Sequence, residues 1–235
     1  MRGEKGETGL SGKERVLSQT AAQAYYDRFG EKQDSQGFYE NAAFDDLIAH
    51  TDFQNMQSVF EFGCGTGKLA ARLLENHLSS PAKYLGCDIS PVMIDLAKQR
   101  LAAYGERAQV TLSDGAIRFP CSDHSVDCVV STYVLDLLSV PDIQHCFSEA
   151  RRVLVPDGKL CLASLTSGVN LLSRIISSLW KCTFRLKPAI VGGCRPILLD
   201  SFTDSQEWLV AHKGVVTPFG LPSEVLILIS RSTPE

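Results

Sequence analysis

The sequence contains no run of about 20 apolar residues, the length that a membrane-spanning helix requires. Met1 is followed by charged residues and not by the apolar segment of a secretory signal peptide. With 23 Lys and Arg against 27 Asp and Glu, the formal net charge is −4, so the chain has no overall basic field to attract nucleic acid. These absences predict a soluble, cytoplasmic protein with no transmembrane segment and no nucleic-acid partner.

The eight cysteines include no Cys-x-x-Cys pair, and several of them lie within apolar runs. This spacing favours buried, reduced thiols over a metal site or a disulfide framework. Residues 1–12 are rich in glycine and charge, and their glycines recur at every third position. Because that segment has no proline and only a few repeats, it cannot form a collagen helix, and we expect a disordered tail.

Two helical patterns follow the tail, and together they predict an N-terminal helical cap over residues 13–55. The first pattern starts at Lys13 and carries Tyr25, Tyr26 and Phe29 near one face. These aromatic rings have two interpretations: they pack in the core, or they form a lid whose ring faces meet a cationic ligand.

Strand and helix patterns alternate regularly across residues 56–165. The segments typical of strands are 59–62, 83–88, 109–112, 126–131 and 159–165, and those typical of helices are 68–77, 91–104 and 142–154. Two more strand patterns, 208–217 and 224–230, lie near the end of the chain. We predict an α/β fold: a Rossmann-like, doubly wound, mostly parallel seven-stranded sheet with an antiparallel C-terminal strand.

Residues 166–235 are expected to complete the same domain with a lid or substrate helix and the C-terminal strands. The helix has a broad apolar stripe between Leu171 and Trp180, with Arg174 and Lys181 near it. Three interpretations stay open: a core-facing crossover helix, a lid over an apolar substrate, or a helix that lies on a membrane surface.

The most informative segment is Val59–Lys68, an apolar strand that stops in a glycine-rich turn and opens into a helix. Glycines at alternate positions let a ligand approach the backbone and permit positive φ angles. Lys68 stands where a dinucleotide-binding motif has its third glycine, which disfavours an NAD-dependent oxidoreductase. Leu69 stands where a triphosphate-binding loop has Ser or Thr. The turn therefore suits a nucleoside ligand without phosphates.

Acids follow the next two strands at the edge of the sheet where such ligands bind. Asp88 is placed to accept hydrogen bonds from both hydroxyls of a ribose, and Asp114 could accept from an exocyclic amine. Ser131 ends the fourth strand and joins the cofactor-binding candidates. An adenosine with an amino-acid tail would satisfy these places together.

Three segments carry a family resemblance: Glu61–Gly67, Gly86–Met93 and Arg152–Gly158. Their order and spacing resemble the motifs of class I S-adenosylmethionine-dependent methyltransferases, in particular the branch with the ubiquinone and menaquinone biosynthesis enzymes. The resemblance spans residues 56–165, a methyltransferase core that binds S-adenosyl-L-methionine.

The resemblance also implies roles for individual residues. Glu61 would support the methionine end of the cofactor, Asp88 the ribose and Asp114 the amino group of the adenine. The remaining implied contacts come from the glycine turn, from two side chains that flank the adenine and from the backbone beside Asp114, namely Gly63, Cys64, Gly65, Gly67, Ile89, Met93 and Gly115.

Methyl transfer from a sulfonium is an in-line displacement that needs a general base only if the acceptor loses a proton. Tyr133 and Asp136 are candidates for such a base, and no metal is predicted. The pattern Asp/Asn-Pro-Pro-aromatic of enzymes that methylate nucleic-acid bases is absent at Ser131–Tyr133. We therefore expect a small-molecule methyl acceptor, and an apolar acceptor and peripheral membrane contact both stay open. The alternative is a catalytically inactive protein that binds the cofactor.

Overall fold

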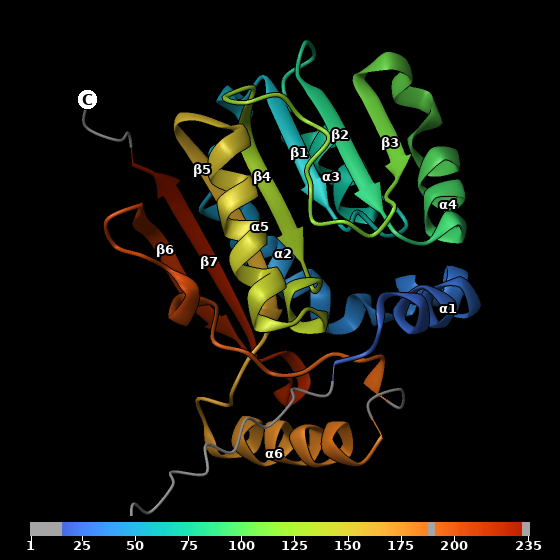
Figure 1. The fold of residues 1–235 in the computed structure, drawn as a ribbon, viewed down its shortest axis with the longest axis vertical. Coiled ribbons are helices and arrows are strands. Elements are labelled where there is room, and N and C mark those ends of the chain that lie inside the picture. Colours follow the sequence, from blue (N-terminus) through green and yellow to red (C-terminus); the bar gives the residue numbers. More distant parts are fainter. Residues whose placement is uncertain (1–15, 188–190, 232–235) are drawn as a thin grey trace, which may run out of the picture.

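The computed structural model describes residues 16–187 and 191–231, so the predicted tail at 1–12 lies outside the described residues. The centre of the fold is one seven-stranded sheet (Figure 1). Its strands are β1 (Ser58–Phe62), β2 (Lys83–Asp88), β3 (Ala108–Leu112), β4 (Val126–Thr132), β5 (Leu154–Leu165), β6 (Trp208–Val216) and β7 (Ser223–Ser230).

The strand order is β3-β2-β1-β4-β5-β7-β6, and the first five strands run parallel. Strand β7 lies between β5 and β6 and is antiparallel to both. The predicted fold class is confirmed, including the single antiparallel strand. Chain order reverses between β1 and β4, and ligands of such sheets bind beside this switch point, at the carboxyl ends of the strands.

Helices cover both faces of the sheet. Figure 1 shows α5 on one face and α2 and α3 behind the other. The α-helices are α1 (Gln19–Phe29), α2 (Gly37–Ala49), α3 (Lys68–Asn76), α4 (Pro91–Leu101), α5 (Val140–Val153) and α6 (Leu171–Leu186). Short 3-10 turns include η1 (Gly30–Gln36), η4 (Leu135–Leu137) and η7 (Pro218–Gly220).

The alternation of side chains along the strands divides the core into two layers. In β4, Cys128 and Val130 face the layer that holds α2 and α3, while Val129 faces the layer of α5. All three side chains are buried, as expected for a central parallel strand with helices on both faces. This packing holds the carboxyl ends of β1, β2 and β4 side by side, at the edge of the sheet where the cavity described below lies.

One strand boundary differs from the prediction. The strand predicted at 159–165 starts at Leu154, and residues 155–158 form an irregularity within it, because Leu154 pairs with Val126 and Lys159 pairs with Cys128. Three extra residues bulge out of the longer strand, and Asp157 adopts φ 60° there. Pairing across a bulge depends on the partner strand, so the local turn signal could not reveal it.

The eight cysteines are all free, and five of them are buried, namely Cys64, Cys87, Cys128, Cys146 and Cys161. The prediction of reduced thiols without a disulfide framework agrees with this arrangement. Within residues 16–187 and 191–231, no helix has the length and apolarity that crossing a bilayer demands.

Candidate functional site

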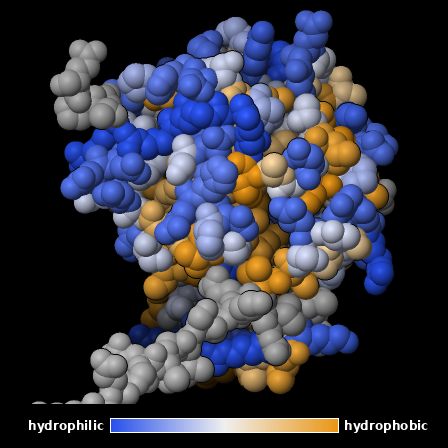
Figure 2. All heavy atoms as spheres, in the orientation of Figure 1, coloured by the Kyte–Doolittle hydropathy of each residue, from blue (hydrophilic) through white to orange (hydrophobic). Residues whose placement is uncertain are grey.

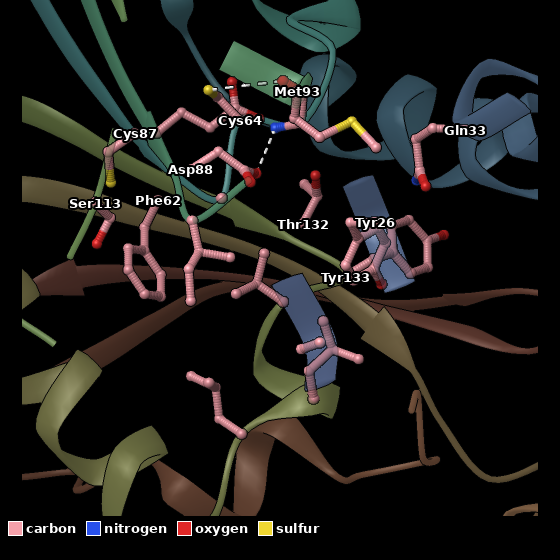
Figure 3. A pocket seen from close by; sticks show the side chains of 18 of the residues that line it. Tyr26, Gln33, Phe62, Cys64, Cys87, Asp88, Met93, Ser113, Thr132 and Tyr133 are labelled. Carbon is pink, nitrogen blue, oxygen red and sulfur yellow. Dashed lines mark hydrogen bonds between the residues drawn. The ribbon is translucent and has the colours of Figure 1, made fainter. Parts of the chain in front are cut away.

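A cavity opens at the carboxyl ends of β1, β2 and β4. Figure 3 shows its lining, with Asp88 and Cys64 at one side and Tyr26 and Tyr133 together at the other. Helix α1 and turn η1 contribute Tyr26 and Gln33, so the N-terminal helices cover the cavity. The cavity is therefore enclosed between the sheet edge and the first helices of the chain.

The glycine turn after β1 forms the side of the cavity nearest the sheet. Gly63, Gly65 and Gly67 have φ angles of 78°, 51° and 73°, in the region that glycine tolerates best. A Cβ atom on Gly63 would lie 2.2 Å from Val134 Cγ2, whereas one on Gly65 would meet no atom within 4 Å. The space beside Gly65 is open, and it is the cradle in which a ligand could reach the backbone.

Asp88 connects this turn to the start of α4. Its Oδ2 accepts a hydrogen bond from the Gly65 N–H at 3.0 Å, and its Oδ1 accepts one from the Ser90 N–H at 2.8 Å. Burial raises the pKa of Asp88, and these backbone hydrogen bonds act in the opposite direction. The backbone N–H groups of Gly65, Ser90 and Ile89 all lower this pKa by hydrogen bonding, and a carboxylate offers about four acceptor positions, so acceptor capacity remains for a ligand.

Glu61 lies below the turn and is almost fully buried. The Tyr84 hydroxyl donates a hydrogen bond to Glu61 Oε2 at 2.5 Å. Burial raises the pKa of Glu61 to about 8, although the Tyr84 hydrogen bond lowers it. The carboxyl group thus reaches neutral pH largely protonated and borders the cavity.

Three side chains of the cap attach it to the segments that line the cavity. Gln19 of α1 donates to the Gly115 carbonyl, and the Ser90 hydroxyl donates to Asp27 Oδ1 at 2.6 Å. In η1, Asp34 accepts from the Thr66 hydroxyl at 2.7 Å and pairs with Arg100. Gly115, Ser90 and Thr66 lie in the segments that follow β3, β2 and β1, and Arg100 lies on α4, so the cap is attached at each of these strand ends.

Aromatic residues gather at the far end of the cavity. The rings of Tyr39 and Phe44 meet Tyr133 edge to face, with ring centroids 5.4 and 6.5 Å apart. Tyr133 has φ 56°, a costly conformation for an aromatic residue, and its hydroxyl donates to Ser223 Oγ at 2.9 Å. Cys194 also lines this end. Strained residues are concentrated at functional sites, and this end of the cavity suits an apolar or aromatic ligand.

One buried carboxylate lies among these rings. Glu40 of α2 is 5% exposed and borders the cavity. Burial raises its pKa to about 7, while Lys68, with Nζ 3.9 Å from Oε2, lowers it. Gln33 donates to Oε1 at 3.2 Å. A group with this pKa can accept or release a proton near neutral pH.

Most of the residues predicted from the sequence border the cavity. They are Glu61, Gly63, Cys64, Gly65, Asp88, Ile89, Met93, Gly115 and Tyr133.

Four predicted residues lie outside the lining. A Cβ on Gly67 would lie 3.2 Å from Ala97 Cβ, so this glycine serves the packing of α4. Asp114 is exposed and accepts a hydrogen bond from the Ala116 N–H, and the Ser131 hydroxyl donates to the Phe62 carbonyl. Asp136 is fully buried, and burial raises its pKa to about 7.

Gln19, Asp34 and Glu40 contribute to the site and were not predicted from the sequence. A signal for Glu40 exists, because it shares one helical face with Phe44 and Leu47 at spacings of four and seven residues. An acid on an otherwise apolar face indicates a functional or paired carboxylate. No comparable pattern surrounds Gln19 or Asp34, whose partners are distant in the sequence.

Asp46 on α2, His50 just after it and His212 on β6 form a separate cluster, with side-chain ligand atoms within 4.8 Å of one another. His212 Nε2 lies 2.8 Å from Asp46 Oδ2, and the imidazole rings stack at 3.6 Å with planes inclined by 10°. An imidazole binds a metal in its own ring plane, and two parallel planes at this separation do not converge on one ion. As arranged, the cluster fixes α2 to β6.

Residues 59–158 match a protein family described as "Methyltransferase domain". Among solved structures, the magnesium protoporphyrin IX methyltransferase of Synechocystis, with bound SAH, superposes with a TM-score of 0.66 at 18% identity. The match covers 92% of this chain and 100% of that one, and at this identity it is a likeness of fold.

Two relatives are similar in sequence. The demethylmenaquinone methyltransferase of Lactobacillus johnsonii is 32% identical over 126 residues, which cover 53% of this chain and 49% of the relative. The tRNA N(3)-methylcytidine methyltransferase Mettl2 of Drosophila melanogaster is 27% identical over 158 residues, which cover 60% and 47%. The chain spans about half the length of these relatives. Because one of them is named for tRNA, the exclusion of a nucleic-acid acceptor is not supported.

Proposed function

We propose that this chain, a class I S-adenosylmethionine-dependent methyltransferase by its domain and fold, transfers a methyl group to a small apolar or aromatic acceptor. The observation that carries the proposal is a single cavity with a ribose-type acceptor, Asp88, at one end and a group of aromatic rings at the other. The fold places both at the switch point of the sheet, where ligands of doubly wound proteins bind.

The residues present fit this cofactor. We propose that the Asp88 carboxylate, held by the backbone N–H groups of Gly65 and Ser90, accepts hydrogen bonds from the ribose hydroxyls. The cofactor supplies an electrophilic methyl group when bound. The open space at Gly65 lets its tail approach the backbone, and Glu61 borders the same region. Met93 and Ile89 offer apolar contacts to the base.

The contribution of the chain to the reaction is mainly positioning. The cap excludes water from the cavity through its bonds to Gly115, Ser90 and Thr66. Fixing the reacting atoms in line can lower the barrier by roughly 7–11 kcal/mol. Tyr39, Phe44 and Tyr133 hold a flat or apolar acceptor against the methyl group.

Glu40 is the candidate proton acceptor. It borders the cavity, its pKa is raised to about 7, and Lys68 stabilises its ionised form. An acceptor that must lose a proton, such as a phenol or a protonated amine, would release it to this carboxylate. Tyr133 is less suited, because burial raises the pKa of its hydroxyl, which already donates a hydrogen bond to Ser223 Oγ. Asp136 lies outside the cavity lining.

A nucleic-acid acceptor is the second candidate, supported by the similarity to the tRNA enzyme. The two candidates differ in their demands on the surface. A tRNA needs a basic path to the cavity mouth and gives activity that falls steeply with salt concentration. A small apolar acceptor reaches the aromatic end with little dependence on salt.

The experiment is methyl transfer from S-adenosylmethionine labelled in its methyl group, offered to phenols, quinols, amines and total tRNA in parallel. The proposal expects label in an aromatic or apolar small molecule and little in tRNA. Label in tRNA alone would contradict the proposed small-molecule acceptor and favour a nucleic-acid acceptor. Binding of S-adenosylhomocysteine without label in any acceptor would favour an inactive cofactor-binding protein.

A further inference from the structure

Helix α6 presents an apolar stripe to solvent, whereas Ser173, Ser177 and Trp180 lie on the side that faces the protein. Leu171, Leu172, Ile175, Leu179 and Leu186 are between 51% and 79% exposed. At 100° per residue these five side chains fall within a sector of about 100°, which we call the α6 stripe. A helix that completes a core buries such a stripe, whereas the α6 stripe is exposed to solvent.

The inward side of α6 is anchored by polar contacts. Ser173 and Ser177 are buried, and the Ser177 hydroxyl accepts a hydrogen bond from the Gly168 N–H at 3.1 Å. Trp180 Nε1 donates to the Cys194 carbonyl at 2.9 Å. These contacts define which side of the helix faces the protein. Because the α6 stripe lies on the opposite side, it is exposed to solvent.

The apolar surface continues beyond α6 toward the cavity. Turn η7 packs against the helix so closely that a Cβ on Gly220 would lie 2.3 Å from Ile176 Cδ1. Beside it, Phe219 is 78% exposed and meets the half-exposed ring of Phe38 at 5.7 Å. Phe38 in turn contacts Tyr39, which lines the cavity. Apolar surface therefore runs from the α6 stripe to the aromatic end of the site.

Charge in this region has one sign. Residues 158–199 contain six Lys and Arg and no Asp or Glu, although the whole chain is acidic. Three of the six, Arg174, Lys181 and Arg185, project along one flank of the stripe at 100° per residue. Figures 1 and 2 show α6 at the lower margin of the molecule, with apolar atoms along its outer side.

We propose that the α6 stripe and its basic flank form a docking surface for an anionic lipid bilayer. An apolar stripe bordered by Lys and Arg is the arrangement of helices that lie in the membrane interface. A second copy of this chain is a poorer occupant, because a two-fold contact through α6 would bring two basic flanks together. The proposal is independent of the methyl acceptor, since it depends only on the surface.

The test is co-sedimentation with vesicles of phosphatidylcholine and phosphatidylserine, against vesicles of phosphatidylcholine alone. The wild type is expected to bind the mixed vesicles, and Leu171→Glu with Ile175→Glu to lower the affinity at least about tenfold. Arg174→Glu with Arg185→Glu should weaken binding to the mixed vesicles specifically. The matched control is Leu209→Glu with Val210→Glu, two residues of β6 with 47% and 44% exposure, which should change nothing.

Three results would overturn the proposal. The first is a wild type that binds neither kind of vesicle. The second is an equal loss of affinity in the β6 control. The third is a wild-type dimer in sedimentation velocity that the stripe variant dissociates, without any binding to vesicles. A thermal melt of each variant separates loss of the surface from loss of the fold.

Discussion

The Asp88 carboxylate accepts the backbone N–H of Gly65 at 3.0 Å, so the end of β2 and the glycine turn after β1 form one structural unit. The same carboxylate receives the Ser90 N–H at 2.8 Å. A carboxylate offers about four acceptor positions, so these backbone bonds leave capacity for a ribose hydroxyl. These hydrogen bonds hold the glycine turn in place and keep the Asp88 carboxylate at the cavity, where a ligand can bind to it.

Substitution of Gly65 should affect the cofactor more than the fold. In Gly65→Ala the new methyl group enters the open space of the cavity, while the φ of 51° costs about 1–2 kcal/mol of stability. We expect the affinity for S-adenosylhomocysteine to fall at least about tenfold, measured by calorimetric titration.

Gly105→Ala is the control for this substitution. Gly105 also has a positive φ, 55°, and a Cβ there would meet no atom within 4 Å, but it lies outside the cavity lining. This variant should lose stability and keep its affinity. Equal affinities in the two variants would mean that Gly65 does not face the cofactor.

The pH dependence of methyl transfer should follow the ionisation of Glu40. If its ionised form accepts the proton, kcat/KM rises with pH through about 7, the pKa to which burial raises this group. Lys68→Met removes the cation that lowers this pKa, so the rise should move to higher pH. Glu40→Gln should lower kcat about 100-fold or more, and Glu106→Gln, at an exposed position, should not. A rise that stays in place in Lys68→Met would exclude this role.

The stability of the protein should fall as the pH rises through the titration of Glu61. Its pKa is 4.5 ordinarily and about 8 in the fold, so the folded state holds the proton more tightly. The resulting stabilisation is complete below pH 4.5 and is lost as the pH rises through about 8.

Glu61→Gln removes this ionisation and leaves an oxygen to accept the Tyr84 hydrogen bond. The free energy of unfolding from urea titrations should therefore depend less on pH in the variant than in the wild type. Glu40 and Asp136 titrate in the same interval, so the difference between the two proteins is the diagnostic quantity. Parallel pH profiles would show that Glu61 is ionised in the fold.

The strands and helices of residues 56–165 could be predicted from the sequence because the residue patterns that define them are local. Ser90 accepts a hydrogen bond from the Met93 N–H and Pro91 is the first residue of α4, and both are helix-start signals that residue types alone provide. The positive φ angles of the glycine turn follow in the same way from the spacing of Gly63, Gly65 and Gly67.

Features that depend on distant partners were not predictable. The bonds of Gln19 and Asp27 join α1 to loops more than 60 residues away. Asp114 was placed at the right strand end, but its carboxylate turns back to its own loop, a local hydrogen bond typical of Asp. Three interpretations of the helix pattern at Leu171–Trp180 were open, and its contacts through Ser177 and Trp180 decide which side faces the protein.

The most direct test of the account is a calorimetric titration of S-adenosylhomocysteine into the wild type, Asp88→Ala and Asp95→Ala. Asp95 is an exposed acid on α4, so its variant controls for the loss of one charge near the site. We predict that the wild type and Asp95→Ala bind with equal affinity and that Asp88→Ala binds at least about tenfold more weakly, as expected for the loss of charge-assisted hydrogen bonds. Absence of binding to the wild type, or undiminished affinity in Asp88→Ala, would contradict the assignment of this cavity to the cofactor.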